Sequence, residues 1–141
     1  MLGRLLQHAV GVQGRAVDRL LRPEGVTRIQ LGVLQQASRS GVSMGTLAAR
    51  LGCHVSNLTG VVDRMQSQGL VRRHRAPRDR RSILIRLTAE GETLRGRLGL
   101  PVGDLQERLA GALSAAENRQ LCSLLEKYIA GAEQQVETVA G

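Results

Sequence analysis

Residues 70–91 of the chain read LVRRHRAPRDRRSILIRLTAEG. The apolar lead-in, the arginine-rich middle and the alternating stretch ILIRL at 83–87 predict two β-strands joined by a charged hairpin, with a helix beginning after Thr88. Charge at this density favours contact with a polyanion, whose phosphates neutralise it and release counterions. A merely solvated arginine-rich loop is the alternative. Seven arginines accompany the one acid of this hairpin, Asp79, and they are Arg72, Arg73, Arg75, Arg78, Arg80, Arg81 and Arg86.

The whole chain is basic, with 141 residues and a formal net charge of +8. Its length predicts one domain with its own core. The positive charge favours an acidic partner, nucleic acid before an anionic membrane surface. The chain has no Phe or Trp, and Tyr128 is its one tyrosine. Because single-strand and RNA binders rely on aromatic stacking, double-stranded DNA is the expected partner.

Membrane association and disulfide stabilisation are not expected. No apolar run approaches the roughly 18 residues of a spanning helix, and the first residues are interrupted by polar side chains, unlike a signal peptide. We therefore expect a cytoplasmic protein without a membrane segment. Cys53 and Cys122 are too few for a disulfide framework or a metal knuckle, and we expect both thiols in the core.

The N-terminal third contains two helix patterns. Apolar residues recur at intervals of three and four over residues 2–21, which predicts an amphipathic helix. Thr27 and Gln30 have the spacing of a capping box. The helix that they open is expected to continue until Ser40 and Gly41.

The next two helices have the pattern of a helix-turn-helix. Ser43 can cap a helix over 44–51 that Gly52 ends, and a second helix is expected over 55–68. A tight turn between short helices, with small polar residues on the free face of the second, is typical of this motif. A helical hairpin without a function is the alternative, but the basic hairpin follows at once and favours a winged helix. The predicted free face comprises Ser56, Asn57, Thr59, Gly60, Asp63 and Arg64.

The C-terminal part is expected to be helical from Thr88 to about residue 113, with a bend or break near Pro101. Ser114 and Glu117 form a second capping box, which opens the last helix. The first and last two helices are too apolar for a small winged core alone. Leu2, Leu5 and Leu6 and the apolar stripes of the last two helices are therefore expected to pair in a homodimer, whose two reading heads suit a palindromic site.

Together these patterns predict an all-α fold with a small two-stranded β wing, that is, a winged helix-turn-helix with a helical dimerisation region. The chain is expected to form a single domain over 1–141. Within it, the DNA-binding part covers 27–87, and the dimerisation part covers 1–22 and 88–138.

Several short motifs, in this order, resemble those of the MarR family of transcriptional regulators. The resemblance extends along nearly the whole chain and implies a homodimer whose first and last helices interlock across the twofold axis. The motifs are LAARLG at 47–52, SNLT at 56–59, VDRM at 62–65, GLV at 69–71, DRR at 79–81 and LTAEG at 87–91.

The resemblance also implies roles for single residues. The helix at 55–68 would enter the major groove of DNA, and Arg81 at the wing tip would reach the adjacent minor groove, oriented by Asp79 through a charge-assisted pair. A narrow minor groove attracts arginine, and Asn57 has the donor and acceptor that read an adenine edge. The residues expected at DNA are Ser56, Asn57, Thr59, Arg64, Arg75, Arg78, Asp79, Arg80 and Arg81.

The chain departs from the family pattern in places. No serine stands at the usual cap of the helix at 55–68, so either His54 or Ser56 caps it, and Gly60 removes one possible base contact.

Family members often respond to small anionic phenolic ligands in a cleft between the dimer helices and the DNA-binding part. The polar candidates for such a pocket are His8, Gln13, Arg15 and Gln30, and surface exposure explains each of them equally well.

The sequence thus predicts a transcriptional regulator that binds double-stranded DNA sequence-specifically, as a repressor released by a small anionic ligand. One alternative is a redox sensor that uses the thiol of Cys53, which the following helix N-terminus could activate. Another is an architectural protein that coats DNA without choosing sequence. Such a protein would present Lys or Arg in place of Ser56, Asn57 and Thr59.

An enzyme is not expected. The three histidines, His8, His54 and His74, lie in different segments, and none has the spacing of a catalytic triad. No glycine motif of the phosphate-cradling kind is present, and no Cys or His cluster has metal-ligand spacing. We therefore expect no catalytic residue, no metal and no cofactor.

Overall fold

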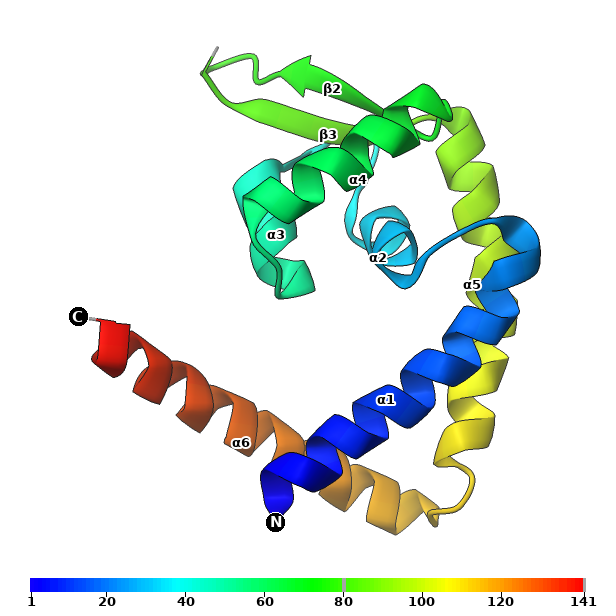
Figure 1. Cartoon of the computed structure of the whole chain (residues 1–141), viewed down its shortest axis with the longest axis vertical. Helices are drawn as coiled ribbons and strands as arrows, with labels where there is room; N and C mark the ends of the chain where they lie inside the picture. Colours follow the sequence, from blue (N-terminus) through cyan, green and yellow to red (C-terminus); the bar gives the residue numbers. More distant parts are fainter. Residues whose placement is uncertain (80, 141) are drawn as a thin grey trace. The chain divides into compact units, whose positions relative to one another are not determined.

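The computed structural model of the chain describes residues 1–79 and 81–140. They form two compact units, Met1–Leu105 and Gln106–Gly141. The predicted class is confirmed, since helices dominate and one small sheet is present. In chain order (Figure 1), the elements are α1 (Leu2–Leu21), a short 3-10 helix η1 (Arg22–Glu24), α2 (Arg28–Gln36), β1 (Val42–Ser43), α3 (Met44–Leu51), α4 (Val55–Ser67), β2 (Val71–Arg75), β3 (Ile83–Leu87), α5 (Ala89–Ala110) and α6 (Ala115–Ala140).

The predicted helix caps are present. Thr27 Oγ1 accepts a hydrogen bond from the backbone N–H of Gln30 (3.3 Å), and Gln30 Oε1 accepts one from the backbone N–H of Thr27 (2.9 Å). Ser43 Oγ caps α3 by accepting from the N–H three residues later (3.1 Å). At the start of α6, Ser114 Oγ accepts from the backbone N–H of Glu117 (3.3 Å), and Glu117 Oε2 accepts from the backbone N–H of Ser114 (2.8 Å). Because these bonds satisfy otherwise unpaired N–H groups, they fix where each helix begins.

The expected end of the second helix was wrong, and the sheet has one strand beyond the two of the predicted wing. The helix α2 ends at Gln36, and Ala37 is already extended. The chain beyond it joins the sheet, since Ser38 bridges Arg86 and β1 pairs antiparallel with β3. The sheet therefore has three strands in the order β1-β3-β2. A two-residue strand is too short to show the alternation from which strands are predicted.

A break near Pro101, one of the two outcomes expected there, is wrong, because α5 continues as one helix through Pro101. Proline removes one backbone hydrogen bond and crowds the preceding turn. Packing offsets this cost here: Leu98 and Val102, on either side of the proline, are only 2% and 3% exposed. Tertiary burial outweighs local preference at this position.

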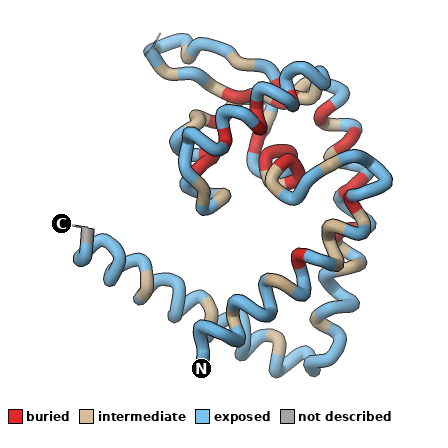
Figure 2. Tube along the Cα trace, viewed as in Figure 1, coloured by how far each residue is buried: buried red, intermediate tan, exposed pale blue. Residues whose placement is uncertain are grey.

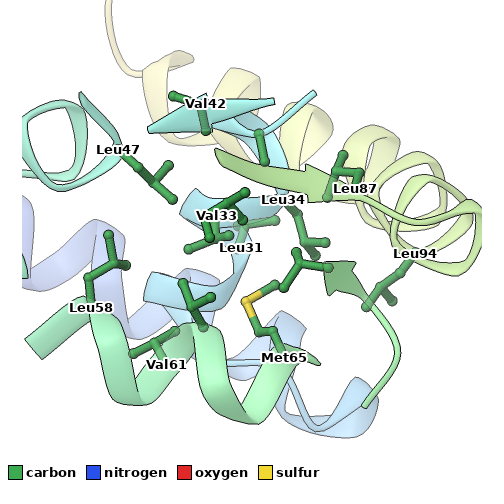
Figure 3. Packing of buried hydrophobic residues seen from close by; sticks show 14 of the residues in the cluster. Leu31, Val33, Leu34, Val42, Leu47, Leu58, Val61, Met65, Leu87 and Leu94 are labelled. Atoms are coloured by element: carbon green, nitrogen blue, oxygen red, sulfur yellow. The ribbon is translucent and has the colours of Figure 1, made fainter. Parts of the chain in front are cut away.

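The core of Met1–Leu105 fixes α4 in place. Figure 3 shows Leu58, Val61 and Met65 projecting from α4 into the same cluster as Leu31 and Leu34 of α2. Burial of a side chain of this size contributes about 1.5–3 kcal/mol relative to exposure. In Figure 2 the buried residues of this unit gather on α2, α3, α4, the sheet and the first half of α5. One face of α4 is thereby held inward, and the opposite face is left to solvent.

A close backbone approach ties the hairpin to α5. Thr88 Oγ1 donates to the carbonyl oxygen of Gly69 (2.6 Å) and accepts from the N–H of Gly91 (3.0 Å). A Cβ on Gly91 would overlap the carbonyl oxygen of Leu70. Glycine is therefore required where the first turn of α5 crosses the chain that leads into β2.

Within Gln106–Gly141, α6 carries apolar side chains that this unit leaves exposed, among them Leu124 and Ile129. None of residues 115–139 is buried. Cys122 is exposed, which corrects its expected place in the core, because α6 has no covering layer within the unit. Cys53, by contrast, is half-buried and packs against the core as expected. Across the described residues, no helix has both the length and the apolar character needed to cross a membrane.

Candidate nucleic-acid interface

The outer face of α4 is polar and small. The residues predicted there are all exposed, because Leu58, Val61, Val62 and Met65 occupy the buried side. A helix with such a face fits the major groove of DNA, where base edges present donors and acceptors. The predicted residues are Ser56, Asn57, Thr59, Gly60, Asp63 and Arg64; Val55, Gln66 and Ser67 of α4 are exposed as well.

The start of α4 is now assigned. His54 occupies the N-cap position without a side-chain cap bond, and its carbonyl oxygen accepts from the N–H groups of Asn57 and Leu58, both at 3.1 Å. Of the two expected caps, His54 therefore holds the position, although its imidazole does not cap. Ser56 and Asn57 lie in the first turn, where their side chains are exposed.

Thr59 presents a defined chemistry. Its hydroxyl donates to the carbonyl oxygen of Val55 at 2.9 Å, so the donor is used within the helix. The methyl group and the remaining lone pairs are what an approaching base would meet. A methyl group suits the C5-methyl of thymine. Gly60 follows with open space around it, which lets a base edge approach the backbone.

Asp63 is not a free acid on this face. Arg73 Nη1 of β2 lies 2.6 Å from Asp63 Oδ1 of α4. The sequence grouped Arg73 with six other arginines, but the pleat of β2 turns it toward α4. The charge of Arg73 is therefore paired with Asp63, and this ion pair joins β2 to α4.

The hairpin tip is organised by Asp79. Its Oδ1 accepts from the backbone N–H of Arg81 (3.0 Å), and its Oδ2 accepts from Ser82 Oγ (2.7 Å). These bonds, Ser82 first and Arg81 second, hold the pKa of Asp79 below its ordinary value. Asp79 was expected to orient the guanidinium of Arg81. It instead fixes the Arg81 backbone, and the guanidinium is exposed.

The remaining arginines of the hairpin differ in accessibility. Arg75 and Arg78 are exposed, as the predicted contact role requires. Arg80, which was also predicted to contact DNA, lies outside the described residues. Arg72 and Arg86 form a cross-strand pair on the sheet face that points away from the core. The exposed arginines, Arg75, Arg78 and Arg81, are accessible to phosphates or to a groove.

The predicted ligand-pocket residues do not share an environment. His8, Gln13 and Arg15 are exposed on α1, where His8 lines a shallow hollow. Gln30 is 7% exposed and belongs to the capping box of α2, where its Nε2 also lies 3.4 Å from Gln68 Oε1. No group of three or more potential metal ligands occurs among the described residues.

The chain is similar to known proteins both in sequence and in structure. The family model described as the MarR family matches residues 24–82. The homoprotocatechuate degradative operon repressor of Escherichia coli is 33% identical over 85 residues, which are 60% of this chain and 57% of that protein, so the match spans little more than half of the relative.

Two solved structures resemble nearly the whole chain. A Cys-to-Ser variant of MarR from E. coli, in complex with operator DNA, has 31% identity and a TM-score of 0.82, and the match covers 90% of this chain and 92% of that one. CouR from Rhodococcus jostii RHA1, bound to p-coumaroyl-CoA, has 31% identity and a TM-score of 0.79, with 90% of each chain covered. The winged reading head and the helices around it therefore occur together in known regulators.

Proposed function

The chain belongs to the MarR family of transcriptional regulators, and from this premise we propose that it is a sequence-specific repressor that a small ligand releases from double-stranded DNA. The similar MarR structure is in complex with operator DNA. The curated relative is described as a repressor of a degradative operon. A role as a regulator rather than an enzyme agrees with both, and we propose that the chain acts on DNA in the cytoplasm.

One observation carries the proposal: α4 exposes a small polar face, and the hairpin that follows exposes arginines. Asn57 and Arg64 supply the groups that read base edges, while Ser56 and Thr59 add a hydroxyl and a methyl. Arg81 at the tip supplies the charge for a minor groove. Phosphate contacts position such a protein, and base contacts give it specificity.

We propose that the active form is a homodimer. Helices α1 and α6 each expose apolar side chains, Leu2 and Leu5 on the first, Leu124 and Ile129 on the second. Contiguous apolar surface of more than a few hundred Å² is uncommon on monomers. A twofold dimer buries such surface and presents two α4 helices to a palindromic operator.

The effector is proposed to be a small anion. The similar CouR structure holds p-coumaroyl-CoA, an anionic ligand, and this chain is basic. His8, Gln13 and Arg15 are accessible to a ligand, whereas Gln30 is engaged in its capping box. A ligand loosens DNA binding only as far as it prefers the released state, and typical couplings imply roughly a 5- to 150-fold loss of affinity.

Selection of bound duplexes from a random pool tests the proposal. A sequence-specific dimer should enrich a palindrome and hold it against excess random duplex, typically by a factor of 10³ or more. The variant Asn57→Ala should reduce this preference while leaving random-duplex binding nearly unchanged. Recovery of no common sequence would instead indicate an architectural binder and contradict the proposed function.

A further inference from the structure

Two arginines face each other on the outer side of the sheet. Arg72 of β2 and Arg86 of β3 are direct antiparallel partners. Their neighbours Val71, Ile85 and Leu87 are buried on the core side, so the pleat places both guanidinium groups on the opposite face. Like charges directly opposite each other destabilise a strand pair. Compensating negative charge would therefore stabilise this arrangement.

The side chain of Arg86 is held in position by Gly41. A Cβ on Gly41 would lie 3.1 Å from Arg86 Cγ and 3.3 Å from Arg86 Nε, and Gly41 has a φ of 98°. The arginine stem therefore crosses the glycine backbone at close range. Arg86 Nε is buried, and no group of the described residues accepts its hydrogen. This N–H is thus shielded from water on the side of Gly41.

No acid of the described residues neutralises this pair. The ion pairs that the structure describes use other cations: Asp63 binds Arg73 on the core side, and Glu92 lies 2.7 Å from Arg95. Neither Arg72 nor Arg86 takes part in one within the described part of the chain. The compensating charge has to come from outside these residues.

Two serine hydroxyls lie in the segment that pairs with Arg86. Ser38 bridges the backbone of Arg86, and its Oγ lies 2.7 Å from Ser40 Oγ. Arg39, between these serines, is exposed. The two guanidinium groups themselves supply hydrogen-bond donors for an oxyanion, since guanidinium groups bind phosphate and carboxylate through paired N–H groups.

We infer that Arg72 and Arg86 form a clamp for a phosphate-type oxyanion on the outer face of the sheet. The phosphate is either a free ion from solution or a backbone phosphate of bound DNA. The free-ion case does not depend on the proposed function. Occupation of the clamp would neutralise the cross-strand repulsion and stiffen the base of the wing.

The first test uses the full-length chain without DNA. Inorganic phosphate replaces chloride at constant ionic strength, and the arginine Nε–H signals are followed by NMR, with that of Arg86 assigned from its loss in Arg86→Lys. We expect this signal to shift and saturate. At ten times the dissociation constant, the Tm should rise by about 3 to 6 °C. Both responses should disappear in Arg72→Gln and persist in Arg50→Gln, which removes the same charge from an exposed position of α3.

Reversal of the charge at Arg72 tests the clamp without added phosphate. Arg72→Glu places a carboxylate across from Arg86, so its Tm in chloride should rise toward that of the phosphate-bound wild type, and phosphate should then have no further effect. Phosphate also stabilises proteins non-specifically. An equal rise of Tm in the wild type, Arg72→Gln and Arg86→Lys would therefore overturn the inference, as would a phosphate response that survives in Arg72→Glu.

Titration with duplex DNA distinguishes a free phosphate ion from a DNA backbone phosphate in the clamp. In phosphate-free buffer, a DNA phosphate in the clamp would shift the Arg86 Nε–H signal when duplex is added, whereas a free-ion site would respond only to inorganic phosphate. A signal that responds to neither overturns the clamp. Duplex binding is measured in the same samples by the change in molecular tumbling, so failure of the clamp is distinguishable from failure of the proposed function.

Discussion

Asp63 and Arg73 join α4 to β2 through an ion pair of 2.6 Å whose arginine side chain is 26% exposed and whose aspartate side chain is 58% exposed. The pair neutralises an acid on the helix that is proposed to face DNA. A pair this exposed stabilises the fold only modestly, by about 0–1 kcal/mol. Its larger effect is electrostatic, because an unpaired carboxylate on this face would repel phosphates.

The first prediction follows from this pair. Arg73→Gln should weaken binding to specific and random duplex alike, by about 1 kcal/mol, since Asp63 becomes an uncompensated charge. The double variant Asp63→Asn/Arg73→Gln should recover most of the loss. Fluorescence anisotropy with the specific and the random duplex measures the affinities for this double-mutant cycle. If Arg73 itself contacted a phosphate, the double variant would bind as weakly as Arg73→Gln.

The second prediction concerns the tip of the hairpin. Hydrogen bonds from Ser82 and Arg81 hold the pKa of Asp79 below its ordinary value of 3.8. A lowered folded-state pKa means that the ionised form stabilises the tip; this contribution is present above pH 3.8 and is lost as the pH falls through the lower, folded value. The backbone amide signal of Arg81 should titrate with that lowered pKa. In Asp79→Asn the transition should vanish, and an Arg81 amide titrating at or above 3.8 would contradict the assignment.

The third prediction separates affinity from specificity. Arg81→Ala should weaken specific and random duplex alike by about 1 to 3 kcal/mol if its guanidinium fills a minor groove, because that contact carries little base information. Asn57→Ala should mainly reduce the preference for the cognate site. Titration of both variants with both duplexes tests the roles. Equal losses on specific and random duplex in both variants would refute them.

Part of this interface could be predicted from the sequence, and part could not. Helix boundaries marked by side-chain caps, such as those at Thr27 and Ser43, were predictable because capping is local chemistry. The exposed face of α4 followed from helical periodicity. The Asp63–Arg73 pair was not predictable, because nothing in the sequence distinguishes Arg73 from the arginines around it. Its partner depends on the pleat and on the placement of α4 against β2.

The course of α5 illustrates the same limit. Pro101 is a local signal against a helix, and burial of Leu98 and Val102 overrides it. Likewise, the strand β1 exists because β3 offers an unpaired edge, not because Val42 and Ser43 carry a strand pattern. Non-local packing decides both features.

The fourth prediction tests the contact between α5 and the hairpin. Gly91→Ala should destabilise the fold by about 1 to 3 kcal/mol, because its Cβ would overlap the carbonyl oxygen of Leu70. Gly96→Ala is the matched control in the same helix: no atom lies within 4 Å of its Cβ, so alanine should stabilise by roughly 0.5 to 1 kcal/mol. Urea unfolding measures both. Equal effects of the two substitutions would rule out the close approach.

The last prediction concerns the dimer. If the apolar side chains of α6 are covered by a second copy, Ile129→Glu should shift the chain toward a monomer, because a charge would then be buried at the interface. Gln134→Glu adds the same charge to the same helix without removing apolar surface, and it should leave the assembly intact. Sedimentation at micromolar concentration distinguishes a 15.2 kDa monomer from a dimer of about twice that mass. The monomeric variant should also lose most of its affinity for a palindrome while retaining weak binding to a half-site, since each reading head is built within one chain. A wild-type chain that sediments as a monomer would refute the dimer, and unchanged sedimentation of Ile129→Glu would exclude this part of α6 from the interface.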